Sequence, residues 1–492
     1  MLPVLQGPST TIRVGRVLTE PSHAVPLGAT AIHIADGKVV TLEPVDPASL
    51  TRHERGLLLL PALANAHDHG RGLRTIAAGA PDGRLEEWAV GLARHPKVDS
   101  YLVAAIAFAR LAESGVAAVN HCHNPQDSEF LLAEAEAVSR AARDTGVRVA
   151  FALPFADRNP FVYGDLGELL DRLPPEDRPA IAATRQRSRA INLELFGKIT
   201  ELEHDCFILQ YGPVAPQWTR DDTLEEIARA SAENGRRVHM HLFETRRQRE
   251  WADAAYPEGL IHHLDNMGLL SPRLTVAHAV WLHPDECRLM AERGVTVSIN
   301  VSSNLRLRSG LPDFETMRHA RLGFGVGLDG MSLDDDEDIL REIRLLRLLH
   351  DGIGDHRPFA AAELFDAACI AGRRTITGDD GGGRIVPGAP ADLLVLDFAE
   401  MSRDFVRDDI DIPALVLARA TRRHVKRLFI NGKEIVRDGR CVTIDLPRLE
   451  AELHASARAA LAKYDPDPAR VARIQHGVAD FFACGCHRTG RR

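Results

Sequence analysis

Runs of positive charge, long apolar stretches and cysteines are all scarce in this 492-residue sequence. Acidic and basic residues alternate closely around a formal net charge of −9, so the chain offers no basic patch to a nucleic acid. No stretch approaches the roughly 18 uninterrupted apolar residues of a membrane span, and no basic segment followed by an apolar one opens the chain. We therefore expect a cytoplasmic protein with no nucleic-acid partner and no membrane association.

The seven cysteines are odd in number and scattered, which favours reduced thiols over a disulfide framework. Cys484, Cys486 and His487 form the one cluster that resembles a metal site. Three such residues in a polar tail usually occur together by coincidence, so we expect no metal there.

Short apolar runs alternate with amphipathic segments from about residue 57 to residue 380, as is typical of βα units around a parallel sheet. Eight runs are expected to be strands: Leu57–Ala64, Val116–Asn120, Val147–Leu153, Phe207–Tyr211, Arg237–Leu242, Leu274–His278, Val295–Asn300 and Phe324–Asp329. Apolar residues three and four apart predict helices over Ser100–Glu113, Ser128–Thr145, Asp221–Asn234, Arg246–Met267, Pro284–Arg293 and Asp335–His350. Eight strands and their helices predict an α/β fold, a (β/α)8 TIM barrel.

Both flanks of the barrel carry shorter strand patterns, at Ala31–Glu43, Ala391–Leu396 and Val425–Val436. Asp-Gly at 36–37 and Asn-Gly at 431–432 are typical of tight hairpin turns. We therefore expect a small β-sandwich domain formed from both flanks.

The predicted division of the chain has three parts. The β-sandwich domain takes residues 1–60 and 384–445, the barrel takes 61–383, and 446–492 form a helical C-terminal tail that ends in a partly disordered Gly/Arg-rich stretch. Inside the barrel, an insertion at about 154–204 follows the third strand. Because loops at the carboxyl ends of barrel strands form the active-site rim, this insertion is either a lid or pocket wall, or a packing or subunit-contact element.

Histidines and a carboxylate collect at the predicted strand ends. His67 and His69 follow the first strand, His241 closes the fifth, His278 the sixth and Asp329 the eighth. Barrel enzymes build their sites at this end, and barrel strands otherwise carry branched apolar side chains. The set therefore predicts a metal site, and nitrogen and carboxylate ligands without a thiolate suit zinc or iron(II).

A divalent ion at this position would lower the pKa of a coordinated water to near neutrality. Glu244, three residues past His241, is placed to accept that proton and pass it to the leaving group, unless it pairs with Arg246 or Arg247. His278 either holds the water or polarises the substrate, or it is a hydrogen-bonded core histidine.

Three further histidines are candidates for lesser roles. His239 shares a strand face with His241 and competes for the ligand position, and we prefer His241 because it lies nearer the strand end. His121 and His123 close the second strand and are expected to be pocket-wall or structural residues.

Five segments carry motifs of a known family: Pro61–His69, His241–Thr245, Ala277–His278, Leu328–Gly330 and Gly388–Asp397. On these motifs the chain resembles the amidohydrolase superfamily, in its cytosine deaminase-like, S-adenosylhomocysteine deaminase-like and triazine hydrolase-like branch. The resemblance implies that Glu244 shuttles protons, that His278 helps to hold water or substrate, and that Asp329 assists as a base. It also implies a homo-oligomer and one divalent metal ion, zinc or else iron(II), on His67, His69, His241 and Asp329.

Two departures from related patterns refine this expectation. Cys206–Tyr211 contains no lysine of the kind that binuclear relatives carbamylate, so one metal is predicted. Where many relatives have His-Asn-Pro after the seventh strand, this chain has Ile299-Asn300-Val301, although the following Ser-Asn pair is kept. Substrate contacts are expected from the amides and aromatic rings of Gln217, Trp218, Trp281, Asn300 and Asn304.

These observations together predict a metal-dependent aminohydrolase, or deaminase, that releases ammonia from a nitrogen heterocycle such as a purine, pterin, pyrimidine or triazine. The same residues would also serve hydrolysis of a cyclic amide or loss of another leaving group, such as a substituted amine or chloride. The alternative of another class is a catalytically inactive metal-binding scaffold. Glu244, His278 and Asp329 argue against the scaffold, because it would need no proton shuttle beside a metal.

Overall fold

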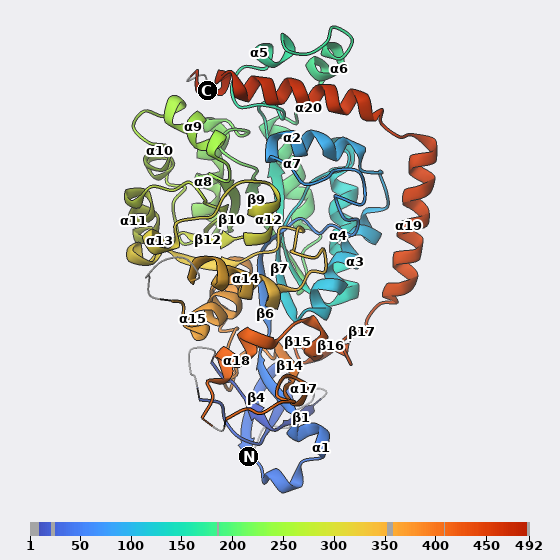
Figure 1. The fold of residues 1–492 in the computed structure, drawn as a ribbon, viewed down its shortest axis with the longest axis vertical. Helices are drawn as coiled ribbons and strands as arrows, with labels where there is room; N and C mark the ends of the chain where they lie inside the picture. The colour runs from blue at the N-terminus through green and yellow to red at the C-terminus, as the bar shows by residue number, and fades with distance from the viewer. Residues whose placement is uncertain (1–8, 21–24, 185, 352–357, 408, 490–492) are drawn as a thin grey trace.

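The computed structural model describes residues 9–20, 25–184, 186–351, 358–407 and 409–489. Its centre is a parallel barrel whose eight strands are hydrogen-bonded in sequence order (Figure 1). The backbone N–H of Asp329, just past the last strand, donates to the His67 carbonyl at 2.9 Å and brings that strand's end against the first. The strands are β6 (Leu63–Asp68), β7 (Val116–Cys122), β8 (Arg148–Phe155), β9 (Phe207–Pro213), β10 (Val238–Leu242), β11 (Leu274–His278), β12 (Thr296–Ile299) and β13 (Gly323–Val326). The predicted (β/α)8 barrel is confirmed.

The first predicted strand, Leu57–Ala64, is wrong as a single barrel strand. Its first half is β5 (Leu57–Pro61), which pairs antiparallel with β14 (Leu393–Asp397) in the smaller domain, and the barrel begins only at Leu63. Pro61 has no N–H to continue a ladder, and the chain changes sheets directly after it. Both halves are buried and apolar, so the hydrophobic pattern does not mark the boundary.

The flanking segments form a domain of two stacked sheets, as predicted. One sheet contains β1 (Thr10–Val14), β3 (Thr30–Ala35) and β4 (Lys38–Pro44); the other contains β2 (Arg16–Val17), β5, β14, β15 (Val425–Ile430), β16 (Lys433–Arg437) and β17 (Arg440–Cys441). Apolar side chains from both sheets fill the space between them, among them Ile12, Ile32, Leu59, Leu393 and Phe429. Both predicted turns have two successive positive φ angles, 50° and 74° at Asp36-Gly37 and 51° and 70° at Asn431-Gly432, which tight hairpins require.

The helices that follow the barrel strands match the predicted segments, with one break. Pro257 and Gly259, the latter at φ 94°, divide the predicted Arg246–Met267 helix into two shorter ones. None of the helices in the described ranges is both long and apolar enough to cross a membrane. The helices are α3 (Ser100–Glu113), α4 (Leu131–Thr145), α8 (Asp221–Asn234), α9 (Arg246–Ala255), α10 (Leu260–Asn266), α11 (Pro284–Glu292) and α14 (Ile339–Asp351).

Two additions cover the end of the barrel where its strands finish. The 154–204 insertion contributes α5 (Leu166–Leu170) and α6 (Arg178–Ala183) to this cover, while its last helix, α7 (Arg189–Thr200), packs against α4, β8 and β9 on the side of the barrel. The C-terminal tail is helical, as predicted: α19 (Leu446–Lys463) runs along the barrel, and α20 (Pro468–Ala483) crosses over α2 (Leu85–Gly91) beside α5 and α6 (Figure 1). The Gly/Arg-rich end of the tail, which the sequence predicts to be partly disordered, includes residues 490–492. These three lie outside the described residues.

The expectation of reduced thiols is wrong for one pair, because Cys484 and Cys486 form a disulfide. A left-handed turn at Gly485, with φ 74°, folds the chain back on itself and brings the two residues together. The other five cysteines are free. His487 bonds through Nε2 to Glu250 at 2.9 Å.

Candidate active site

Side chains from four strand ends converge at the mouth of the barrel. Asp329 Oδ1 lies 3.1 Å from Nε2 of both His67 and His69. His241 Nε2 lies 3.4 Å from His69 Nε2, and the nitrogens of the three histidines lie within 4.8 Å of one another. His278 joins a second such group with His67 and Asp329. The five side chains that the sequence placed at strand ends therefore form one metal site.

Backbone carbonyls orient two of these imidazoles. His69 Nδ1 lies 2.7 Å from the Cys122 carbonyl, and His241 Nδ1 lies 2.8 Å from the Val214 carbonyl. A carbonyl oxygen only accepts, so each Nδ1 carries the proton and each Nε2 directs a lone pair into the site.

His239, the competitor of His241 in the sequence, stands behind His67. Its Nε2 lies 2.7 Å from His67 Nδ1, and the two rings stack with centroids 4.9 Å apart. His239 thus orients His67 and leaves His67 Nε2 facing Asp329, while His241 occupies the ligand position.

The donor set fits a divalent cation. His67 Nε2 is buried without a hydrogen-bond partner, since its approach to Asp329 has the distance but not the angle of a hydrogen bond. Burial lowers the pKa of His67 to about 4, so the ring is neutral at pH 7. Burial opposes ionisation of Asp329, but His67 and His69 outweigh it and hold the pKa of Asp329 well below its ordinary range. Lone pairs and a carboxylate that face one another in this way repel unless a cation lies between them.

Asp68 ties together the loops that carry the ligands. Its Oδ1 accepts the Gly70 N–H at 2.6 Å and its Oδ2 accepts the Gly330 N–H at 3.2 Å. The two glycines follow His69 and Asp329 directly, so this carboxyl fixes the distance between the two ligands. Burial and the neighbouring Glu337 raise the pKa of Asp68 to about 7.

Glu244 and His278 lie against the ligand cluster. His278 Nε2 is 3.7 Å from Glu244 Oε2 and 4.0 Å from Asp329 Oδ2, and its Nδ1 donates to Asn304 Oδ1 at 2.8 Å. Glu244 is only 2% exposed, and burial raises its pKa to about 7. The alternative partners Arg246 and Arg247 pair with other glutamates, so neither occupies Glu244.

Three residues at or next to the site have left-handed backbone. Phe243, His278 and Asp329 have φ of 47°, 73° and 59°, and such strain concentrates at functional sites. Gly327 is needed for close packing below Asp329, because a Cβ there would lie 2.2 Å from Asn300 Oδ1.

A cavity of about 220 Å³, here called the metal cavity, opens onto these groups. Trp88 and Trp218 line it together with Ala156 and Pro160. The last two belong to the 154–204 insertion, which therefore contributes a pocket wall.

Of the predicted substrate contacts, Trp218 alone lines the metal cavity. Gln217 borders a separate surface hollow, and Trp281 donates its indole N–H to the Ser309 carbonyl at 2.9 Å. Asn300 and Asn304 contact His278 from behind, at 3.3 and 2.8 Å from its Nδ1.

The sequence analysis missed Glu86, Trp88 and Arg71. Glu86 joins α2 to the site by accepting bonds from Tyr163 at 2.9 Å and Thr245 at 2.7 Å. Trp88 lies on the same helix, whose spacing gives no sign that it covers the barrel mouth. Arg71 had the clearest signal, since it stands two residues after His69.

A (β/α)8 barrel whose strand ends bring together imidazoles and a carboxylate defines a metal-dependent hydrolase. The model of the Amidohydrolase family matches residues 58–435, and the chain belongs to this family. It therefore hydrolyses carbon–nitrogen bonds with the help of a metal.

The chain is similar to named enzymes over most of its length. It is 26% identical over 404 residues to 5-methylthioadenosine/S-adenosylhomocysteine deaminase of Bacillus cytotoxicus, covering 80% of this chain and 85% of that one. It is 27% identical over 407 residues to 5'-deoxyadenosine deaminase of Methanothermobacter thermautotrophicus, covering 81% and 86%.

Solved structures share the fold. An adenosine deaminase from Xanthomonas campestris with bound zinc superposes with a TM-score of 0.75 at 23% identity, covering 92% of this chain and 98% of that one. The atrazine chlorohydrolase of Arthrobacter aurescens in complex with zinc gives 0.74 at 21% identity, covering 91% and 99%.

Proposed function

We propose that the protein is a mononuclear zinc aminohydrolase that releases ammonia from an amino-substituted nitrogen heterocycle, with the purine ring as the first candidate. The observation that carries the proposal is the position of Glu244 and His278, which face Asp329 from within the metal cavity. The deaminases of adenine nucleosides among the relatives support the purine.

In this proposal His67, His69, His241 and Asp329 hold the metal. When bound there, zinc supplies Lewis acidity, which activates water at neutral pH. The zinc in two structures of the same fold favours zinc over iron(II).

The protein's own side chains move the protons. Glu244 accepts a proton from the attacking water through its carboxylate and delivers it to the amino nitrogen that leaves as ammonia. A pKa raised to about 7 by burial suits both halves of this task. His278, held by Asn304, directs the lone pair of Nε2 at the attacking water. Asp329 Oδ2 takes the second proton of the water and passes it to the neighbouring ring nitrogen, so that the ring is left as a lactam when ammonia departs.

The walls of the metal cavity suit a flat ring. Trp88 and Trp218 offer aromatic faces, while Leu85 and Leu307 are apolar. A ring held there would present one edge to Glu244 and His278 and would exclude bulk water from them.

The variant Glu244→Gln tests the proton shuttle. It should keep its metal but lose ammonia release by at least about 100-fold, because the amide accepts no proton. The matched control is Glu226→Gln, on α8 away from the site, which should retain wild-type turnover. Equal behaviour of Glu244→Gln and wild type would refute the proposal and favour the scaffold alternative.

A further inference from the structure

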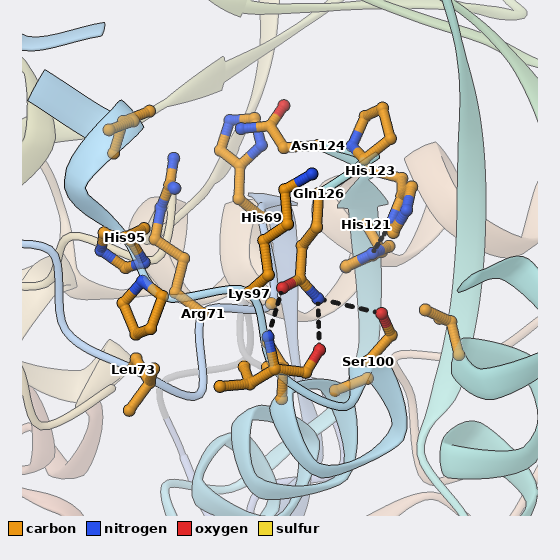
Figure 2. A pocket seen from close by; sticks show the side chains of 18 of the residues that line it. His69, Arg71, Leu73, His95, Lys97, Ser100, His121, His123, Asn124 and Gln126 are labelled. Atoms are coloured by element: carbon orange, nitrogen blue, oxygen red, sulfur yellow. Dashed lines mark hydrogen bonds between the residues drawn. The ribbon is translucent and has the colours of Figure 1, made fainter. Parts of the chain in front are cut away.

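A second cavity, of about 270 Å³, opens beside the metal cavity and is here called the side cavity. The two cavities share His69, Arg71, Leu92 and Asn124. Figure 2 shows Arg71 and His95 on one wall and His121 and His123 on the other. The shared residues make the side cavity an extension of the metal cavity.

Arg71 stands where the two cavities meet. Its Cζ lies 5.2 Å from the centre of the Trp88 ring, and its Nε is buried without a hydrogen-bond partner. Among the described residues, no carboxylate lies within ion-pair distance of this guanidinium and no acceptor bonds to it. Arginine stays protonated in proteins, and the carboxylates of Asp329 and Asp68 attract this guanidinium only from beyond ion-pair distance. A cation without a direct partner therefore stands at the junction of the cavities.

Nothing on the walls of the side cavity neutralises that charge. The residues that line it include no aspartate or glutamate. Lys97, at the exposed rim, is already paired with Asp127 at 2.9 Å. Burial and Arg71 lower the pKa of His95 to about 4, so this ring is neutral, and its buried Nε2 has no partner.

The far wall is held rigidly. Glu134 accepts from His123 Nε2 at 2.8 Å, and His123 Nδ1 lies 3.2 Å from His121 Nε2. Gln126 is fixed in turn by two bonds to the Val98 backbone, at 2.8 and 2.9 Å. The cavity is therefore preformed and needs little reorganisation to receive a ligand.

We propose that the side cavity receives an anionic arm of the substrate, a carboxylate bound by Arg71, while the heterocycle lies in the metal cavity. This inference rests on the proposed function. One unpaired guanidinium matches one negative charge, and its planar fork matches the two oxygens of a carboxylate. The substrate class becomes an amino-substituted heterocycle with a carboxylate side chain.

The carboxylate arm is tested with pairs of compounds that share a ring and differ in the acid group. The pairs are adenine with adenin-9-ylacetic acid, and cytosine with cytosin-1-ylacetic acid. On whichever ring is deaminated, we expect wild type to favour the acid by about 100-fold in kcat/KM. Arg71→Met should abolish that preference, mainly by raising KM for the acid. Arg94→Met, which removes a guanidinium outside both cavities, should retain it. If wild type handles the uncharged partner equally well, the carboxylate arm is refuted and the aminohydrolase stands.

Binding separates the two proposals if no compound releases ammonia. The acids are titrated by calorimetry into zinc-loaded Glu244→Gln protein and into the double variant that also carries Arg71→Met. Binding that Arg71→Met weakens by about 100-fold supports the side cavity even where the aminohydrolase fails. Equal affinities in the two proteins, or no binding of either acid, overturn the inference.

Discussion

Glu244 is a buried carboxyl whose protonation state sets its ability to act as a base. Burial raises its pKa from 4.5 to about 7, while a cation bound nearby favours the carboxylate and acts in the opposite direction. Only the carboxylate accepts a proton, so kcat/KM should fall tenfold per pH unit below a midpoint between 4.5 and 7. A pH profile measured from 4 to 9 tests this, and a profile that stays flat down to its acid end would contradict the assigned role.

His239 supports a ligand without touching the metal position. Its Nε2 is the partner of His67 Nδ1 at 2.7 Å, so His239→Leu should weaken zinc affinity by about 10- to 100-fold. Competition with a chelator measures the affinity, and His319→Asn, at an exposed site, provides the control. An unchanged affinity in His239→Leu would show that the contact plays no part in binding.

Residues with a local signal could be predicted from the sequence. His67, His69 and Asp329 belong to short motifs at strand ends, and the structure brings them together. Glu86 and Trp88 had no such signal, because only tertiary packing carries α2 to the barrel mouth. Asn300 and Asn304 were placed near the site but act on His278 rather than on the cavity.

At the scale of elements, α20 braces the mouth of the barrel. Phe482, 4% exposed, packs on Tyr163 with ring centroids 5.0 Å apart and lies under the Arg247 guanidinium at 4.5 Å. Phe482→Ala should destabilise the protein by about 3 kcal/mol and raise KM, because Tyr163 and Arg247 both hold Glu86.

Thermal melts and steady-state kinetics measure these two effects. Phe405→Ala removes the same side chain at a position that is 88% exposed, so it should leave both quantities unchanged. If Phe482→Ala and Phe405→Ala have the same Tm and the same KM, α20 does not brace the site.

The elements that could be predicted are those with a local pattern. Helices α3 and α8 and both Asp-Gly and Asn-Gly turns lie where the sequence placed them. The passage from β5 to β6 could not be predicted, because one continuous apolar run serves two sheets. The break between α9 and α10 does have a sequence signal, in Pro257 and Gly259. The sequence analysis still predicted one long helix, because the apolar spacing continues on both sides of these residues.

At the scale of the whole molecule, the metal site joins the first barrel strand to the last. His67 and Asp329 come from these two ends, so a bound cation should stabilise the closed barrel. Zinc at about 1,000 times its Kd would add about 4 kcal/mol to the free energy of unfolding, and chelation should lower Tm accordingly. Glu244→Gln should show the same shift, since it retains the ligands. Identical melts with and without zinc would contradict the site.

A cytoplasmic location and a homo-oligomeric state stay predictions. Sedimentation of the full chain would measure the assembly.

Ammonia release by the zinc-loaded protein, with metal counted on the same sample, tests the central claim most directly. The compounds are aminated purines, pterins, pyrimidines and triazines, each with and without a carboxylate arm. We predict release from one ring class at about one metal per chain. A protein that holds its metal and releases no ammonia from any of them would contradict the assignment and leave cyclic amides and other leaving groups as the reactions to examine.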